Sequence, residues 1–370
     1  MKVLTLTTQY ANNYGALLQC YALSHYLNKQ NGIDCRVIDY LPLGYKRSWS
    51  LLSRPKTFKG LIKMLYSLLN IPFVLDKRAK NIKMKKFIRD YIPLTTNNYR
   101  RISILDNPPI ADAYICGSDQ IWNQVIFKDL TYYLDFVDKT RGGKRIAYAA
   151  SVADSWDKEF ESYISESLNK FDSISIREKG NIPQVQSVVP GKKVSWVIDP
   201  VFLLGREEWD KIITTPAINE PYIFCYFLNT SSFAVEVVNR LRKITGYKVV
   251  NFSVDPITKF HCDYNLRRTD PCDFVGFIKN ASYICTNSFH CSAFSIIYEK
   301  KFAFIPKTWA NERVLSLQEI FGIDVIMTKE KYRDFSTKLF DIDYSPGKEN
   351  GEAFINSSKE FLTRALYERY

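Results

Sequence analysis

The sequence lacks the cysteine patterns of a secreted or metal-binding protein. It contains no CxxC pair, and its eight cysteines are scattered over positions 20, 35, 116, 225, 262, 272, 285 and 291. In a chain of 370 residues this spacing favours reduced thiols, and we expect no metal site. The N-terminus also lacks the apolar core and the cleavage site of a signal peptide, which predicts a cytoplasmic protein.

Long hydrophobic runs, internal repeats and low-complexity segments are also missing. The longest apolar stretch, 61–75, is interrupted by Lys63, Asn70 and Pro72, so it is too short and too polar to span a bilayer. No repeat of solenoid or propeller length is present. With 46% hydrophobic and 24% charged residues, the composition is that of a globular protein with material for two cores.

Acidic residues are scarce in one segment, which carries most of the net charge of +12. Between residues 46 and 90 there are thirteen Lys or Arg residues and two Asp residues, and apolar side chains such as Trp49 and Phe58 lie among them. We expect a basic helical insertion at about 43–95, whose residues 46–89 make weak peripheral contact with the anionic inner face of a membrane. A solvated helical pair is the alternative. No nucleic-acid partner is expected, because no nucleic-acid-binding motif accompanies the basic segment.

Apolar strands alternate with helical segments along the whole chain, which predicts parallel sheets covered by helices. The expected strands are 2–8, 35–40, 111–116, 145–150, 172–176, 194–198, 222–227, 248–252, 283–286 and 302–305. Gly and Pro between 203 and 221 indicate a domain connection. We therefore predict two Rossmann-like α/β domains that face each other across a cleft, at 1–205 and 206–350. A C-terminal helix over 351–370 should pack back on the body.

Polar loops follow two strands of the first domain. Asn12, Asn13 and Tyr14 precede an amphipathic helix, whose N-terminus suits an anion or a sugar hydroxyl. Capping of that helix explains Asn12 or Asn13 equally well. After the strand 111–116, the residues Gly117 to Asn123 bring an acid, amides and an indole close together, including Asp119, Gln120 and Trp122. This cluster is typical of a sugar-binding surface, although a turn alone would account for Asp119.

Two further strands end at cationic or titratable residues. Arg177 follows 172–176, and its planar guanidinium matches a carboxylate or a phosphate, with pairing to Glu178 as the alternative. His290 lies at the junction between the strand 283–286 and the next helix, where the helix dipole favours chemistry. Lys300 ends that helix, where its charge would also complement the dipole.

Six segments in order carry a resemblance to a known family: ANNYGALLQCYAL, ICGSDQIWN, RIAYAAS, SIREKG, VIDPVFLL and TNSFHCSAFSII. Together they resemble the polysaccharide pyruvyl transferase family over most of residues 1–306. The resemblance implies a fold similar to GT-B glycosyltransferases and no cofactor. It also implies transfer of the pyruvyl group of phosphoenolpyruvate, a co-substrate, onto two hydroxyls of a sugar in a glycan or glycan precursor. The product is a cyclic ketal, and phosphate is released.

The resemblance also implies roles for particular residues. It places Arg177, His290, Ser288 and Lys300 at the donor, although Lys301 stands where relatives often have Pro and leaves the choice between the two lysines open. We expect His290 to act as the acid or to hold the leaving phosphate, and Asp119 to act as a base toward the acceptor.

The remaining expectations concern the acceptor and the rival functions. The acceptor should contact Asn12, Asn13, Tyr14, Gln120 and Trp122, and attachment of this acceptor to a lipid diphosphate would give the basic segment a purpose. A nucleotide-sugar glycosyltransferase and a non-catalytic glycan-binding relative are the alternatives.

Overall fold

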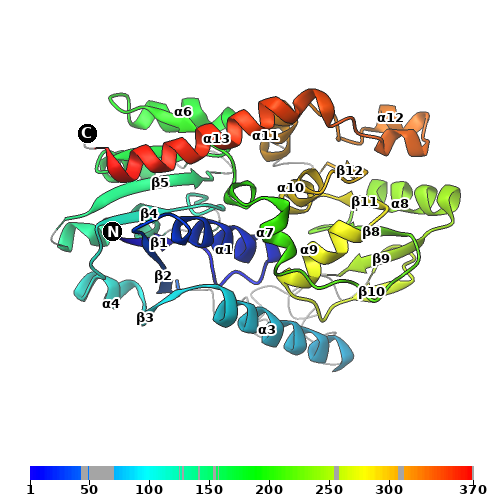
Figure 1. Ribbon diagram of the computed structural model, residues 1–370, viewed down its shortest axis with the longest axis horizontal. Helices are drawn as coiled ribbons and strands as arrows, with labels where there is room; N and C mark the ends of the chain where they lie inside the picture. Colours follow the sequence, from blue (N-terminus) through cyan, green and yellow to red (C-terminus); the bar gives the residue numbers. More distant parts are fainter. Residues whose placement is uncertain are drawn as a thin grey trace.

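The computed structural model describes residues 1–42, 49, 71–124, 126, 129–140, 142–152, 156, 158–253, 258–306 and 312–368. Much of the expected basic insertion, residues 43–48 and 50–70, lies outside the described residues. Within them, the chain forms two parallel sheets with helices packed around each (Figure 1). None of the helices in this part of the chain is long and apolar enough to cross a lipid bilayer.

The first sheet has seven strands among the described residues, in the order β3-β2-β1-β4-β5-β6-β7, and all are parallel. Its strands are β1 (Lys2–Leu6), β2 (Asp34–Tyr40), β3 (Leu94–Tyr99), β4 (Ala113–Cys116), β5 (Lys144–Ala150), β6 (Ser173–Ile176) and β7 (Val194–Trp196). The helices between them are α1 (Tyr14–Asn28), α3 (Ile71–Tyr91), α4 (Arg101–Asp106), α5 (Lys158–Leu168) and α6 (Ile182–Val188).

A connection containing the helix α7 (Arg206–Asp210) leads to the second sheet, which has five parallel strands in the described residues, in the order β10-β9-β8-β11-β12. These are β8 (Tyr222–Tyr226), β9 (Lys248–Phe252), β10 (Tyr264–Leu266), β11 (Tyr283–Thr286) and β12 (Phe302–Phe304). The helices are α8 (Ser232–Thr245), α9 (Pro271–Asn280), α10 (Phe289–Ile297), α11 (Glu312–Phe321) and α12 (Lys329–Arg333).

The edge strands β3 and β10 are absent from the strands expected from sequence. β3 has the sequence LTTNNY and is half exposed, and β10 has only three residues, so neither carries the apolar run of a buried parallel strand. The predicted end of the basic insertion, at about 95, falls inside β3.

The C-terminal helix α13 (Ser345–Tyr367) begins six residues before the expected start at 351. Gly347 and Gly351 allow α13 to lie against Phe321 of α11. A Cβ atom at Gly347 would be 1.5 Å from the carbonyl oxygen of Phe321. Farther along, Leu362 and Leu366 join a buried cluster of the first sheet, so α13 runs from one domain to the other (Figure 1).

The two sheets share one apolar contact region around the start of α1. Tyr14 stacks on Phe274 of α9 with 5.0 Å between ring centroids, and its hydroxyl lies 2.6 Å from Thr269 Oγ1. In each sheet the strand order reverses, between β1 and β4 in the first and between β8 and β11 in the second. The carboxyl ends of strands at such reversals are the usual place for a ligand in open α/β sheets.

Candidate active site

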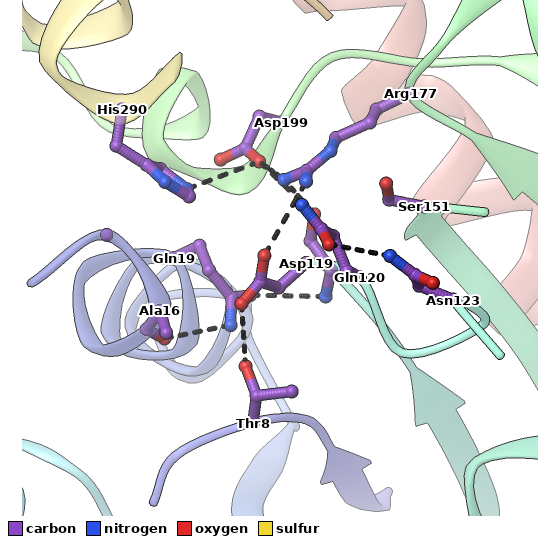
Figure 2. A network of polar contacts seen from close by, with 12 residues as sticks. Thr8, Ala16, Gln19, Asp119, Gln120, Asn123, Ser151, Arg177, Asp199 and His290 are labelled. Carbon is purple, nitrogen blue, oxygen red and sulfur yellow. Dashed lines mark hydrogen bonds and ion pairs between the residues drawn. The ribbon is translucent and has the colours of Figure 1, made fainter. Parts of the chain in front are cut away.

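A buried arginine at the end of β6 is the centre of the polar network in Figure 2. The Arg177 side chain is 1% exposed, and its Nη1 donates to Asp199 Oδ2 at 2.6 Å while its Nε donates to Glu178 Oε1 at 3.0 Å. A third carboxylate, Asp119, lies 3.6 Å from Nη2. Burial alone would lower the pKa of Arg177, but the charges of Glu178, Asp199 and Asp119 outweigh it and hold the pKa above its ordinary value.

The carboxylates around Arg177 come from different strand ends. Asp199 follows β7 and is fully buried; it also accepts from Ser118 Oγ at 3.2 Å. Burial would raise the pKa of Asp199, but contact with His290 and Arg177 holds this pKa well below its ordinary range. Asp119 follows β4 and accepts from Thr8 Oγ1 at 2.9 Å, so the network reaches the end of β1 as well.

His290 connects this network to the second domain. It is the second residue of α10, and its Nε2 lies 3.7 Å from Asp199 Oδ2 (Figure 2). No hydrogen-bond partner for this buried Nε2 occurs among the described residues. The ring fits against the start of α1 because residue 15 is glycine: a Cβ atom there would be 2.0 Å from His290 Nδ1.

A cavity of about 410 Å³ opens beside His290, at the carboxyl ends of both sheets. The first domain contributes loops after β1 and β4, and the second contributes loops after β8, β11 and β12 together with α11. The lining residues are Asn13, Asp119, Gln120, Leu228, Asn229, Ser231, Asn287, Ser288, Phe289, His290, Pro306 and Arg313. The N-terminus of α10 also faces this cavity, and unpaired helix N–H groups attract anions.

Arg313, in the first turn of α11, is the cation that lines the cavity. Its Nη1 and Nη2 lie 2.9 and 3.0 Å from one terminal atom of the Gln120 amide, and with that atom assigned as oxygen it accepts from both. Burial and the nearby charge of Arg177 lower the pKa of Arg313. Arg177 directs its donors at carboxylates, whereas Arg313 directs Nη1 and Nη2 at the neutral Gln120 amide and lines the cavity.

Five residues singled out from the sequence line this cavity: Asn13, Asp119, Gln120, Ser288 and His290. Asn13 also has the structural role considered as its alternative, because it caps α1. Ser288 caps α10, a role that was not considered from the sequence. The predicted pairing of Arg177 with Glu178 is present, but as part of a larger buried cluster.

Three residues expected at the acceptor are absent from the cavity lining. Trp122 is 1% exposed and stacks on Tyr133 at 5.6 Å, so the indole belongs to the core of the first domain. Tyr14 is buried in the contact between domains. Asn12 donates to Asn81 of α3 at 2.7 Å, away from the cavity.

Lys300 is not brought to the cavity either. Its Nζ donates to the Lys279 carbonyl oxygen at 2.8 Å, beyond the C-terminal end of α10, whereas the cavity is at the N-terminal end. Lys301 pairs with Asp341 at 2.7 Å and is not among the residues that line the cavity. Neither lysine therefore lies beside His290.

Two residues of the candidate site, Asp199 and Arg313, were not predicted from the sequence. Asp199 lies in the segment VIDPVFLL just after a predicted strand, and the same reasoning that selected Arg177 would have found it. Arg313 had no comparable signal, because it does not directly follow the predicted strand 302–305 but lies eight residues farther along, in the first turn of α11.

Comparisons with solved structures define the fold. The S. aureus MnaA–UDP structure is similar with a TM-score of 0.54 and 13% identity over 99% of this chain and 96% of that one. A Listeria monocytogenes protein assigned as a UDP-N-acetylglucosamine 2-epimerase is similar with a TM-score of 0.51 and 11% identity. The match covers 100% of this chain and 97% of that one. At these identities the likeness concerns the fold, which is a GT-B-like pair of α/β domains.

The family is defined by sequence. Residues 13–306 match the model of the polysaccharide pyruvyl transferase family, and the chain belongs to that family. Membership implies a transferase in polysaccharide biosynthesis. A search of curated proteins gives no match.

Replacing Arg177 should test whether the buried cluster holds the site together. Arg177→Met leaves Asp199 and Glu178 buried without their cation, and we expect a loss of about 3–5 kcal/mol in the free energy of unfolding, measured by urea denaturation. Arg206→Met is the matched control, because the Arg206–Glu299 pair at 2.7 Å is largely exposed and should cost about 0–1 kcal/mol. Equal losses in both variants would contradict this account of Arg177.

Proposed function

We propose that the protein transfers the pyruvyl group of phosphoenolpyruvate to two hydroxyls of a sugar acceptor in the cavity beside His290. The observation that carries the proposal is the meeting of Arg313, the N-terminus of α10 and the His290 ring around one cavity of about 410 Å³. Phosphoenolpyruvate carries a carboxylate and a phosphate, and these three groups supply the cationic and hydrogen-bonding surface that such anions need.

The reaction requires two additions at one carbon. A proton adds to the methylene carbon of phosphoenolpyruvate, and an acceptor hydroxyl adds to C2 and loses its proton. The bond between C2 and the phosphate oxygen then breaks, and a second hydroxyl adds to C2 with loss of its proton. The products are a ketal carrying a methyl group and a carboxylate, and hydrogen phosphate.

The side chains divide this chemistry between the two domains. His290 Nε2 supplies a proton or a hydrogen bond on the donor side, and Asp199 at 3.7 Å orients the ring. Asp119 lines the opposite wall and is held by Thr8, so its carboxylate can accept a proton from an acceptor hydroxyl. In this proposal Arg177 is a positioning residue, because its donors are occupied by protein carboxylates, and Arg313 binds the donor.

Removal of the His290 imidazole should slow turnover with little effect on folding. We expect His290→Ala to lower kcat by about 10²- to 10⁴-fold, as for loss of a general acid, measured as phosphate release from phosphoenolpyruvate with an acceptor glycan. His261→Ala is the control, since His261 is 60% exposed in a loop of the same domain. Near-normal turnover in His290→Ala would refute the assignment.

Removal of the Arg313 guanidinium should affect donor binding most. We expect Arg313→Ala to raise KM for phosphoenolpyruvate by about 10- to 100-fold, the worth of hydrogen bonds to a charged group, and Arg313→Lys to recover part of the loss. Arg333→Ala, an exposed arginine on α12, should leave KM unchanged.

A thermal-shift titration with phosphoenolpyruvate and a panel of nucleotide sugars tests the donor directly. A saturating ligand at about 100 times its Kd stabilises the folded state by about 2.7 kcal/mol. Stabilisation by phosphoenolpyruvate that disappears in Arg313→Ala supports the proposal. Stabilisation by a nucleotide sugar alone would favour a glycosyltransferase instead.

A further inference from the structure

Helix α3 presents a mixed apolar and cationic stripe to solvent. Ile71, Leu75 and Ile82 are 64%, 49% and 60% exposed, unusual values for large aliphatic side chains. Exposed side chains recur every three or four residues along the helix: Ile71, Leu75, Arg78, Ile82, Lys85 and Arg89. This spacing places all six on one side of an α-helix, which we call the α3 stripe.

The other side of α3 is fixed to the body of the protein. Met84, Phe87 and Ile88 are buried in the same core cluster as residues of α1. The buried Asn81 accepts from Asn12 and donates to the Trp49 carbonyl oxygen at 3.0 Å. The apolar residues of the α3 stripe are therefore not needed to anchor the helix.

The charge of α3 is strongly positive on the exposed side. The helix contains seven Lys or Arg residues and two Asp residues. Asp76 forms an ion pair with Arg268 of the second domain at 2.7 Å. Asp90 forms ion pairs with both Lys86 and Arg89. The carboxylates of α3 thus compensate only part of its charge, and the stripe keeps cations beside exposed isoleucine and leucine side chains.

We propose that the α3 stripe binds the surface of a lipid bilayer that contains anionic lipids. Lys and Arg interact with anionic headgroups, and adjacent Ile and Leu side chains enter the boundary between headgroups and acyl chains. A nucleic acid would use the cations but would leave the three exposed aliphatic side chains without a role. The combination therefore favours a bilayer.

The position of α3 connects this surface to the candidate active site. Asn81 of α3 accepts a hydrogen bond from Asn12. Asn13, which follows Asn12 in the chain, lines the cavity. A membrane-bound α3 holds this loop close to the headgroups, where an acceptor carried on a lipid would be presented. That consequence rests on the proposed function, whereas binding of the bilayer does not.

Flotation of the full chain with vesicles tests the proposal. We expect binding to vesicles of phosphatidylcholine and phosphatidylglycerol at 0.1 M salt, none to phosphatidylcholine alone, and loss of binding at 1 M salt, where the Debye length falls to about 3 Å. The triple variant Arg78→Gln, Lys85→Gln, Arg89→Gln should bind about 100-fold more weakly. The variant Ile71→Gln, Leu75→Gln, Ile82→Gln should also bind more weakly.

A matched control removes three cations elsewhere. Lys329→Gln, Lys331→Gln, Arg333→Gln changes the net charge equally on α12, which lies on the opposite side of the molecule from α3 in Figure 1, and binding should be retained. If the α12 charge variant lost as much vesicle binding as the α3 charge variant, the proposal would be overturned. Tighter binding of duplex DNA than of anionic vesicles at the same salt would also overturn it. Phosphate release with a water-soluble acceptor should be unchanged in the α3 variants, so failure of this proposal is separate from failure of the proposed function.

Discussion

The candidate site depends on one buried guanidinium. Arg177 is buried at the end of β6, and a buried charge without partners would cost several kcal/mol, so the fold must bring carboxylates to it. They come from neighbouring strand ends: Glu178 adjoins Arg177, Asp199 follows β7, and Asp119 follows β4. Convergence on one cation ties these loops together, and through Asp119 the cluster reaches the cavity.

The same pairing decides which groups remain for a ligand. Because Arg177 is surrounded by three carboxylates, this cluster has no excess positive charge to attract an anion. The positive surface of the cavity comes instead from the second domain, through Arg313 and the N-terminus of α10. Residues of both domains line the cavity, so this surface is complete only when the two domains are in contact. Gly15 allows that contact, since it leaves room for His290 beside α1.

The sequence was informative where one local rule determined the structure. Buried parallel strands are continuous apolar runs, and the ten expected ones correspond to β1, β2, β4 to β9, β11 and β12. Two side chains selected because they follow such strands, Asp119 and His290, line the cavity. The positions of residues whose environment depends on distant segments were not predicted. Trp122 is stacked on Tyr133, Lys300 is turned toward Lys279, and Arg313 reaches the cavity from α11, and no spacing in the sequence encodes these contacts.

The two cationic features of the molecule act over different ranges. Exposed charges on α3 act through water, and salt at 0.1 M screens them beyond about 10 Å. Arg313 acts inside a cavity, where water is partly excluded and a charge at contact is stronger. The contact from α3 to the cavity loop is made by two neutral amides, Asn81 and Asn12. The high net charge of the chain is thus no guide to the charge of this cavity, which is set by a few groups at the junction of the two sheets.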